Sequence, residues 1–525
     1  MQHFRSVLAA VAAIATLALL AGCVVNPVTG RSELSLVSEA EERKIGAEQY
    51  VPSQQGQGGT YQVDPELTAY VSQVGKRLAA VSDRKFNYEF VVLNNGVPNA
   101  WALPGGKIAV NRGLLYELNN EAELAAVLGH EVSHAAIGHG AQAMTRGTLM
   151  QGAMVLGAVA VAANDKTSRY SDFVLGGAML GAQLVTMNHG RDAEREADQY
   201  GIEYMVRAGY DPHAAISLQE TFVALFEDKK SGWMEGLFAS HPPSQERVDN
   251  NRKQVEALMP SLQGRDLEVG EARFRQAIAR LNKTKPAYKA FDEAEKAIAK
   301  KDYQMALTKL DSAIKQVPEE ARFHGLKGDI LVYQQHYNDA LASYNEAIKH
   351  DGNYYDYYLG RGVAHARLNQ TALARQDLER STKLLPTAMA MNELGKLALT
   401  DGNRVDAKRY FQQASLAKGL VGQEATAAFA RLEVQDNPAI YAQAEVYADK
   451  RGRVLAKVSN RSPVAMRAVE VQFQVLINGQ IQQRRVALPA LAPNTYADVI
   501  SGLAFPEGAL WTADMMAVQV VAVGL

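Results

Sequence analysis

Residues 130–134 read His-Glu-Val-Ser-His, a spacing that can hold a metal ion. On a helix, residues four apart project from one face, so the neutral imidazoles of His130 and His134 can bind one ion together. Glu131 is turned about 100° from His130, which lets its carboxylate reach a metal-bound water rather than the ion. Zn²⁺ lowers the pKa of such a water to about 7, and a neighbouring carboxylate can take the proton. The pattern therefore predicts zinc-assisted hydrolysis.

The segment around these residues carries the signals of a helix packed in a core. Asn120 can cap its start, Glu123 stands at the third helical position, and Gly138 and Gly140 lie at its end. Its apolar face is formed by Leu124, Val127 and Leu128. An isolated match to the pattern is often an exposed helix, but these apolar neighbours favour a histidine pair that faces a core or a cleft.

A zinc site of this kind needs a third protein ligand. Residues 194–198 read Glu-Arg-Glu-Ala-Asp, and on a helix Glu194 and Asp198 share one face while Glu196 lies on another. We expect Glu194 to be the third ligand and Asp198 to orient a ligand histidine. The alternative is an acidic helix face exposed to solvent, which is how most carboxylates occur.

Four segments together resemble a known family. They are His130–His134, Glu194–Asp198, Asn99–Gly106 and His241–Arg247. In content and order they are similar to the zinc metallopeptidases related to the CAAX prenyl endopeptidase, and the resemblance covers residues 34–255. It implies a mainly α chain whose residues 64–265 form a zincin-type metallopeptidase domain with a small β-sheet.

The resemblance also implies roles for individual side chains. His130, His134 and Glu194 are the expected ligands of one zinc ion per chain, a donor set that other first-row ions can also occupy in vitro. Glu131 is the expected general base, and then the acid for the leaving amine.

Three further side chains are candidates for the site or its surroundings. His241 and Arg247 are implied to lie near it and to stabilise the oxyanion or control access. Physically, His241 could also occupy the open zinc position and switch the enzyme off. His139 lies five residues past His134 and is turned about 140° from it on a helix, which favours a structural histidine over an extra ligand.

A short strand-like region, residues 88–110, precedes this helix. Residues 90–93 and 107–110 are expected to be strands, with a turn at 104–106. The second strand is either exposed beside the cleft, where it could pair with an extended substrate, or an ordinary strand of the sheet. The sequence leaves both open.

Two apolar stretches, residues 149–163 and 173–187, separate the two ligand segments. Each is too short to be a confident membrane span, which needs about 20 residues. We expect helices that flank and cover the active site and that touch a membrane or an unfolded client.

Residues 287–421 repeat at steps of 34, 34 and 33 residues. Small residues recur at Ala306, Ala340, Ala374 and Ala407, and again at Ala313, Ala347, Ser381 and Ala414. Large residues between them are Leu310, Tyr344, Leu378 and Phe411, and the first helix of each unit carries Ala294, Gly328, Gly362 or Gly395. Small residues let two helices approach and the large residue fills the gap, which is the tetratricopeptide pattern of an α-solenoid.

The last part of the chain, residues 436–525, alternates apolar and polar residues with period two. Asn478-Gly479 between two such runs is a strong hairpin signal because both residues tolerate positive φ. We expect a small antiparallel β-sandwich.

The N-terminus has the build of a secretory signal. Arg5 precedes an apolar stretch, and Leu20-Ala21-Gly22-Cys23 resembles a bacterial lipobox. The resemblance implies cleavage of residues 1–22, lipidation of Cys23, and a tether at 23–63 that holds the protein on the inner face of the outer membrane. Asn26-Pro-Val-Thr-Gly-Arg31 after the lipobox resembles the bacterial lipoprotein branch of the family.

Composition narrows the classes of function. The 525 residues suggest three or four domains, and 47% apolar against 21% charged residues excludes wholesale disorder. A net charge of −2 argues against a nucleic-acid partner. Cys23 is the single cysteine, so no intramolecular disulfide exists.

These observations favour a lipid-anchored periplasmic zinc endopeptidase of a Gram-negative bacterium that cleaves misfolded or stalled envelope proteins. Its tetratricopeptide units are expected to bind clients or the outer-membrane barrel assembly machinery. The alternative is a chaperone or scaffold of outer-membrane assembly with low or regulated proteolysis. A prenyl-type membrane protease needs several spanning segments, which the sequence does not supply.

Overall fold

The computed structural model describes residues 23–157, 189–227, 236–488 and 490–524. The described residues up to Leu385 form one compact unit, and those from Pro386 onward form another. The boundary falls inside the predicted repeat region, so the last repeat belongs to the second unit.

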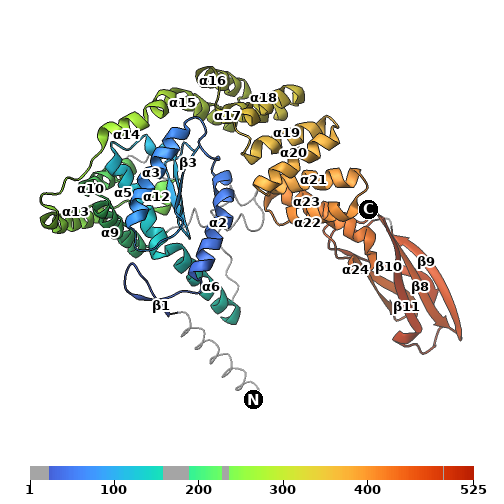
Figure 1. Ribbon diagram of the computed structural model, residues 1–525. Coiled ribbons are helices and arrows are strands. Elements are labelled where there is room, and N and C mark those ends of the chain that lie inside the picture. The colour runs from blue at the N-terminus through green and yellow to red at the C-terminus, as the bar shows by residue number, and fades with distance from the viewer. Residues whose placement is uncertain (1–22, 158–188, 228–235, 489, 525) are drawn as a thin grey trace, which may run out of the picture. The chain divides into compact units, whose positions relative to one another are not determined.

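The larger sheet of the first unit has three strands in the order β3-β5-β4 (Figure 1). Its strands are β3 (Glu89–Leu93), β4 (Ala100–Leu103) and β5 (Lys107–Asn111), with β3 parallel and β4 antiparallel to β5. Both predicted strands are therefore present. β5 is the central strand and all five of its residues are buried. Residues 107–110 are therefore an ordinary strand of the sheet and not an exposed strand beside the cleft.

Helices cover both faces of this sheet. Alternate residues point to opposite faces of a strand, so Ile108 and Val110 pack with α3 (Pro65–Val81) and α5 (Glu121–Ile137), while Ala109 packs with Tyr50 of α2 (Glu39–Gly56) on the other face. Figure 1 shows α2 on the opposite side of β3 from α3 and α5.

Much of the segment expected to be a tether, residues 23–63, is folded. It contains β1 (Cys23–Val25), β2 (Ser32–Leu34) and α2, which begins with a capping box between Ser38 and Glu41. Tyr50 is buried and donates a hydrogen bond to the Ile108 carbonyl. The polar residues that suggested a tether are themselves partly buried, since Gln54 and Gln55 of α2 are 9% and 6% exposed.

The remaining helices of the peptidase region surround α5. They are α4 (Arg112–Leu115), α6 (His139–Gly157), α9 (Arg191–Arg207), α10 (His213–Glu227), α12 (Leu237–Ser240), α13 (Gln245–Leu258), the 3-10 helix η1 (Met259–Leu262) and α14 (Glu271–Ala277). The predicted ends of α5 are confirmed: Asn120 caps it and Gly138 ends it with φ 81°.

The repeats form pairs of helices as predicted. In the first unit these are α15 (Ala279–Ala299) with α16 (Tyr303–Gln316), α17 (Ala321–Tyr333) with α18 (Tyr337–His350), and α19 (Tyr355–Arg367) with α20 (Thr371–Leu384). A methyl group added to Gly328 would lie 2.7 Å from the Tyr344 ring, and one on Gly362 would lie 2.9 Å from Leu378. Small residues therefore face the large ones, for the reason the pattern implied.

The second unit continues the repeats and ends in strands. Its helices are α21 (Ala388–Thr400), α22 (Arg404–Ala414), α23 (Gly419–Asp436) and α24 (Pro438–Tyr441). Its strands are β6 (Ala442–Ala448), β7 (Arg453–Asn460), β8 (Ala468–Ile477), β9 (Gln480–Leu488), β10 (Tyr496–Ala504) and β11 (Met516–Gly524), with the 3-10 helix η2 (Ala513–Met515) before β11.

These strands form two antiparallel sheets, ordered β10-β7-β6 and β11-β8-β9, that share one apolar core. Asn478 and Gly479 both have positive φ and join β8 to β9. The predicted sandwich and its hairpin are confirmed.

Several predictions concern residues outside the described part of the chain. The signal segment 1–22 and the stretch 173–187 lie there, as do residues 158–163 of the other apolar stretch. Among the described helices, none combines the length and the hydropathy needed to cross a bilayer.

Candidate metal centre

Two glycines bring the ligand helices together. Gly129 on α5 and Gly201 on α9 lie where the helices cross: a methyl group on Gly201 would be 3.0 Å from the His130 backbone nitrogen, and one on Gly129 would be 3.0 Å from the Gly201 carbonyl oxygen. Only glycine permits this approach without displacing a backbone. The crossing places the predicted ligand Glu194 opposite His130 and His134.

The donor atoms of four buried or nearly buried side chains converge on one point. His130 Nε2 lies 3.0 Å from His134 Nε2, and the Glu194 carboxylate lies 3.5 and 3.4 Å from these two nitrogens. His241 supplies a fourth donor, since its Nδ1 is 3.0 Å from Glu194 Oε1 and 3.3 Å from His130 Nε2. Ligands about 2.0–2.1 Å from a tetrahedral Zn²⁺ are about 3.3 Å apart, so the four residues fit a metal site.

Asp198 lies behind His130, one of the histidines of the donor cluster. Its Oδ1 is 2.9 Å from His130 Nδ1, which leaves His130 Nε2 to face the other donors. Arg247 donates to both oxygens of Asp198 at 2.7 Å and pairs with Glu194 at 3.0 Å. The guanidinium thus holds two carboxylates in place.

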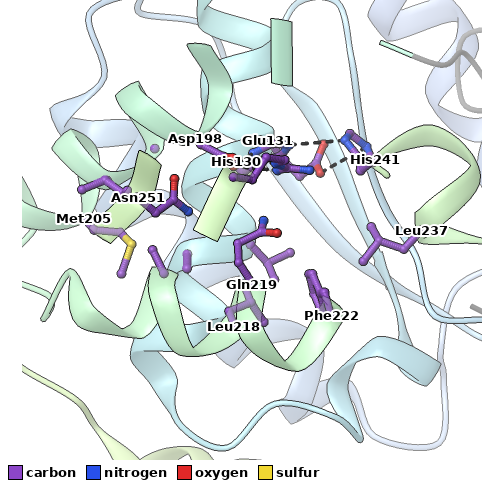
Figure 2. A pocket seen from close by; sticks show the side chains of 16 residues that line it. His130, Glu131, Asp198, Met205, Leu218, Gln219, Phe222, Leu237, His241 and Asn251 are labelled. Atoms are coloured by element: carbon purple, nitrogen blue, oxygen red, sulfur yellow. Dashed lines mark hydrogen bonds and ion pairs between the residues drawn. The ribbon is translucent and has the colours of Figure 1, made fainter. Parts of the chain in front are cut away.

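Glu131 lies beside the donor cluster rather than within it. Its carboxylate is 2% exposed, and Oε1 is 3.7 Å from His241 Nε2. Burial raises the pKa of Glu131 above its usual value, which moves a general base toward the pH at which it works best. Figure 2 shows His241 facing both Glu131 and His130, with dashed lines to each.

The electrostatics of the cluster suit a cation. Burial alone would lower the pKa of His130, but the hydrogen bond with Asp198 and the charge of Glu194 raise it to about 10. Although burial opposes it, the charges of His241 and Arg247 hold the pKa of Glu194 well below its usual range. The carboxylates therefore stay ionised and favour positive charge between them.

His134 has neighbours that the sequence did not suggest. Burial and the nearby His189 lower the pKa of His134 well below its usual value. The His189 ring centroid lies 4.2 Å from that of His134, and burial lowers the pKa of His189 to about 3. Nδ1 of His139 lies 2.8 Å from Nδ1 of His134. His139 is not one of the four clustered donors, but it contacts His134, which is. No sequence signal identifies His189.

A small cavity of about 40 Å³ lies against the cluster (Figure 2). It has His130 and Glu131 at one end, and its walls are mostly apolar. Those walls come from α5, α9, α10 and the start of α12, with Met205, Leu218, Phe222 and Leu237 among them.

Residues 65–255 match the family model described as Peptidase family M48. The chain carries an M48 metallopeptidase domain. This match confirms the family that the four motifs predicted and includes every residue of the donor cluster. Residues 326–388 match a tetratricopeptide repeat model, which confirms the repeats and indicates a protein-binding region.

Three curated proteins illustrate the similarity. The chain is 32% identical to the mitochondrial metalloendopeptidase OMA1 of Schizosaccharomyces pombe, over 45% of this chain and 66% of that protein. It is 28% identical to the beta-barrel assembly-enhancing protease of Escherichia coli, over 45% of this chain and 48% of the relative. It is 29% identical to the metalloprotease YcaL of Escherichia coli, over 36% of this chain and 73% of the relative. The match thus spans less than two thirds of the first two relatives.

Proposed function

We propose that this protein is a zinc endopeptidase of the bacterial envelope that cleaves exposed segments of misfolded or stalled envelope proteins. The observation that carries the proposal is the convergence of His130 Nε2, His134 Nε2 and the Glu194 carboxylate, 3.0–3.5 Å apart, with Glu131 beside them. Two imidazoles, one carboxylate and an adjacent carboxylate base are the parts that metal-assisted amide hydrolysis needs.

Each side chain then has a distinct task. His130, His134 and Glu194 would hold a zinc ion, which would supply Lewis-acid chemistry at this donor set. Glu131 would act as the general base toward an attacking water and then as the acid for the leaving amine. Asp198 holds His130 through Nδ1, and Arg247 holds Asp198 and Glu194, so Arg247 acts here as a positioning residue. Its contacts leave the oxyanion role predicted from the sequence less favoured.

His241 fits a role in control. Its Nδ1 stands among the donors while its Nε2 faces Glu131, so in this arrangement it takes the position that a water and a substrate carbonyl need. We infer that this is a closed form and that His241 must move aside for catalysis.

The rest of the chain suggests where the enzyme works. Two of the relatives are bacterial proteases, one named for β-barrel assembly, and Cys23 ends a lipobox-like segment. We propose that Cys23 is lipidated, that the protein is held on the periplasmic face of the outer membrane, and that its repeats bind unfolded clients or the barrel assembly machinery.

A chaperone or scaffold remains the second candidate because His241 fills the position needed for water. The two functions separate when Glu131→Gln replaces the chromosomal copy. This variant keeps the metal ligands but lacks the base. If cells with this variant lose the envelope function that the wild-type protein supports, the protease is favoured. If that function is unchanged, the scaffold is favoured.

The direct test uses the purified mature chain and casein. Cleavage is expected without chelator, to stop with chelator, and to return on addition of one equivalent of Zn²⁺. A chain that binds zinc but leaves casein and unfolded outer-membrane protein intact would contradict the proposed activity.

A further inference from the structure

The ligand His134 has a second nitrogen, and a chain of contacts leads from it to the N-terminal segment. His134 Nδ1 lies 2.8 Å from Nδ1 of His139, which is 1% exposed. His139 Nε2 lies 3.3 Å from Oε2 of Glu196 on α9. Glu196 in turn pairs with Arg31. The series runs from the metal site to a residue 103 positions before His134.

The order of donors along this series is fixed by chemistry, given the proposed zinc site on which the inference rests. His134 Nε2 faces the other metal donors, so its lone pair is needed there and the proton sits on Nδ1. That N–H must donate to His139 Nδ1, which therefore accepts. His139 then carries its own proton on Nε2 and donates it to Glu196, while Arg31 donates to Glu196.

Arg31 lies in a hydrogen-bonded turn, residues 26–31. The Asn26 side chain is 6% exposed and donates to the Ile137 carbonyl at the end of α5, at 2.8 Å. Its Oδ1 accepts from the Val28 backbone nitrogen at 3.0 Å, and the Asn26 nitrogen donates to the Arg31 carbonyl at 2.8 Å. The turn 26–31 is thus fixed to the helix that carries the histidine pair.

The two ligand histidines have equivalent supports. His130 is backed by Asp198, and Asp198 is held by Arg247. His134 is backed by His139, which is held by Glu196, and Arg31 completes that series. Partners of this kind fix the tautomer and the ring orientation of a metal ligand, and their loss typically lowers metal affinity about 10–100-fold.

We propose that His139, Glu196 and Arg31 are positioning residues for the ligand His134, and that the turn 26–31 is part of the metal centre. The segment before the peptidase domain thereby sets the affinity of the site. This assigns a task to Asn26–Arg31 and to Glu196, which the hydrolytic mechanism does not use.

The test measures the zinc affinity of the full mature chain by competition with a chromophoric chelator. His139→Leu keeps an apolar side chain in the buried position but removes the acceptor, and we expect zinc affinity to fall about 10–100-fold. His139→Asn places an oxygen near the former Nδ1 but lacks the donor to Glu196, so an affinity between those of His139→Leu and the wild type is expected. Equal affinities for wild type and His139→Leu, with unchanged melting temperatures, would overturn the proposal.

Arg31 is tested against an arginine on α9 with similar surroundings. Arg31→Ala is expected to lower zinc affinity several-fold, because Arg31 is 61% exposed and its charge is partly screened. Arg195→Ala removes exposed ion pairs with Asp192 and Glu246 from the same helix and is expected to leave affinity unchanged. Equal effects of the two variants would show that the N-terminal turn does not belong to the centre.

A second readout needs no metal and no activity. In ¹⁵N-labelled, metal-free protein, histidine nitrogen shifts are expected to show His134 protonated at Nδ1 and His139 at Nε2, and His139→Leu is expected to abolish this preference in His134. The opposite tautomer of His134 in the wild-type chain would overturn the proposed order. Zinc binding without casein cleavage would remove the proposed function, while the ranking of affinities would still decide the role of His139.

Discussion

Nε2 of His241 lies 3.7 Å from Oε1 of Glu131, so the histidine that joins the donor cluster also faces the expected base. One side chain thereby covers both parts of the reaction centre. It comes from the segment between α12 and α13 and not from either ligand helix. Movement of this segment alone would expose Glu131 and free one metal position.

His241→Ala is expected to raise casein cleavage, because the closed form loses its fourth donor. A rise of about tenfold corresponds to about 1.4 kcal/mol of stabilisation of the closed form. His213→Ala, which removes an exposed histidine paired with Asp211, is the matched control and is expected to leave the rate unchanged. A simple loss of cleavage in His241→Ala would instead assign His241 to support of the transition state.

The helix crossing gives a prediction about stability and metal together. Gly201→Ala places a methyl group 3.0 Å from the His130 backbone nitrogen, so α5 and α9 must separate slightly. We expect a loss of about 1–3 kcal/mol in unfolding free energy together with weaker zinc binding. The measurements are urea denaturation and chelator competition.

Gly147→Ala is the control for this substitution. Gly147 is also helical, and a methyl group there meets nothing within 4 Å. The replacement is expected to stabilise the chain by up to about 1 kcal/mol and to leave zinc affinity unaltered. Equal losses in both variants would contradict a special role for the crossing.

The turn between the two helices of each repeat has an unfavourable backbone conformation that a glycine would relieve. The turn between the two helices of each repeat has positive φ, at Lys301, Gln335, Asn369 and Gly402 in turn. Only the last is glycine. Gln335→Gly is expected to raise the unfolding free energy by about 0.5–1 kcal/mol, because Gln335 is exposed and its left-handed backbone is unfavourable for a residue with a Cβ atom.

The neighbouring residue provides the comparison. Gln334 has φ −79°, which any residue adopts, so Gln334→Gly is expected to destabilise the chain by a similar amount through the added freedom of the unfolded state. Thermal unfolding of both variants measures the difference. The prediction is wrong if the two substitutions shift the melting temperature in the same direction.

The raised pKa of Asp329 leads to a prediction about how the free energy of unfolding depends on pH. Burial and the neighbouring Asp356 raise the pKa of Asp329 from 3.8 to about 8. Because the folded chain holds this proton more tightly than the unfolded chain, the contribution of Asp329 to stability is greatest at low pH and is lost as pH rises from about 4 to about 8. Asp329→Asn keeps an acceptor for Tyr344, whose hydroxyl donates to Asp329 at 2.7 Å.

The variant is therefore expected to show a smaller fall in melting temperature between pH 5 and pH 8 than the wild-type chain. Asp311→Asn removes an exposed carboxylate that pairs with Lys327 and serves as the control. If Asp329→Asn and wild type lose the same stability over this range, the pKa of Asp329 is not raised in the folded chain and the predicted linkage is absent.

The parts of the fold that were predictable depend on local spacing. The helix of His130 and His134 follows from caps and apolar neighbours within 20 residues. The repeats follow from small and large residues at fixed steps, as the contact of Gly328 with Tyr344 confirms. The Asn478-Gly479 hairpin follows from the backbone preferences of two adjacent residues.

What could not be predicted depends on contacts between distant segments. The approach of His139 to His134 needs the chain to turn at Gly138, and helical geometry continued past that glycine rotates His139 away. The pairing of Arg31 with Glu196 joins residues 165 apart, and nothing in either local sequence indicates it. The folding of residues 23–63 likewise depends on the sheet face that α2 covers.

The most direct test of the central claim is the zinc content of three purified proteins together with their cleavage of casein. Wild type and Glu131→Gln are each expected to hold one zinc per chain, and only wild type is expected to cleave. Glu194→Ala is expected to hold little zinc and to be inactive. A wild-type chain without zinc, or a Glu131→Gln variant that cleaves as fast as wild type, would contradict the account.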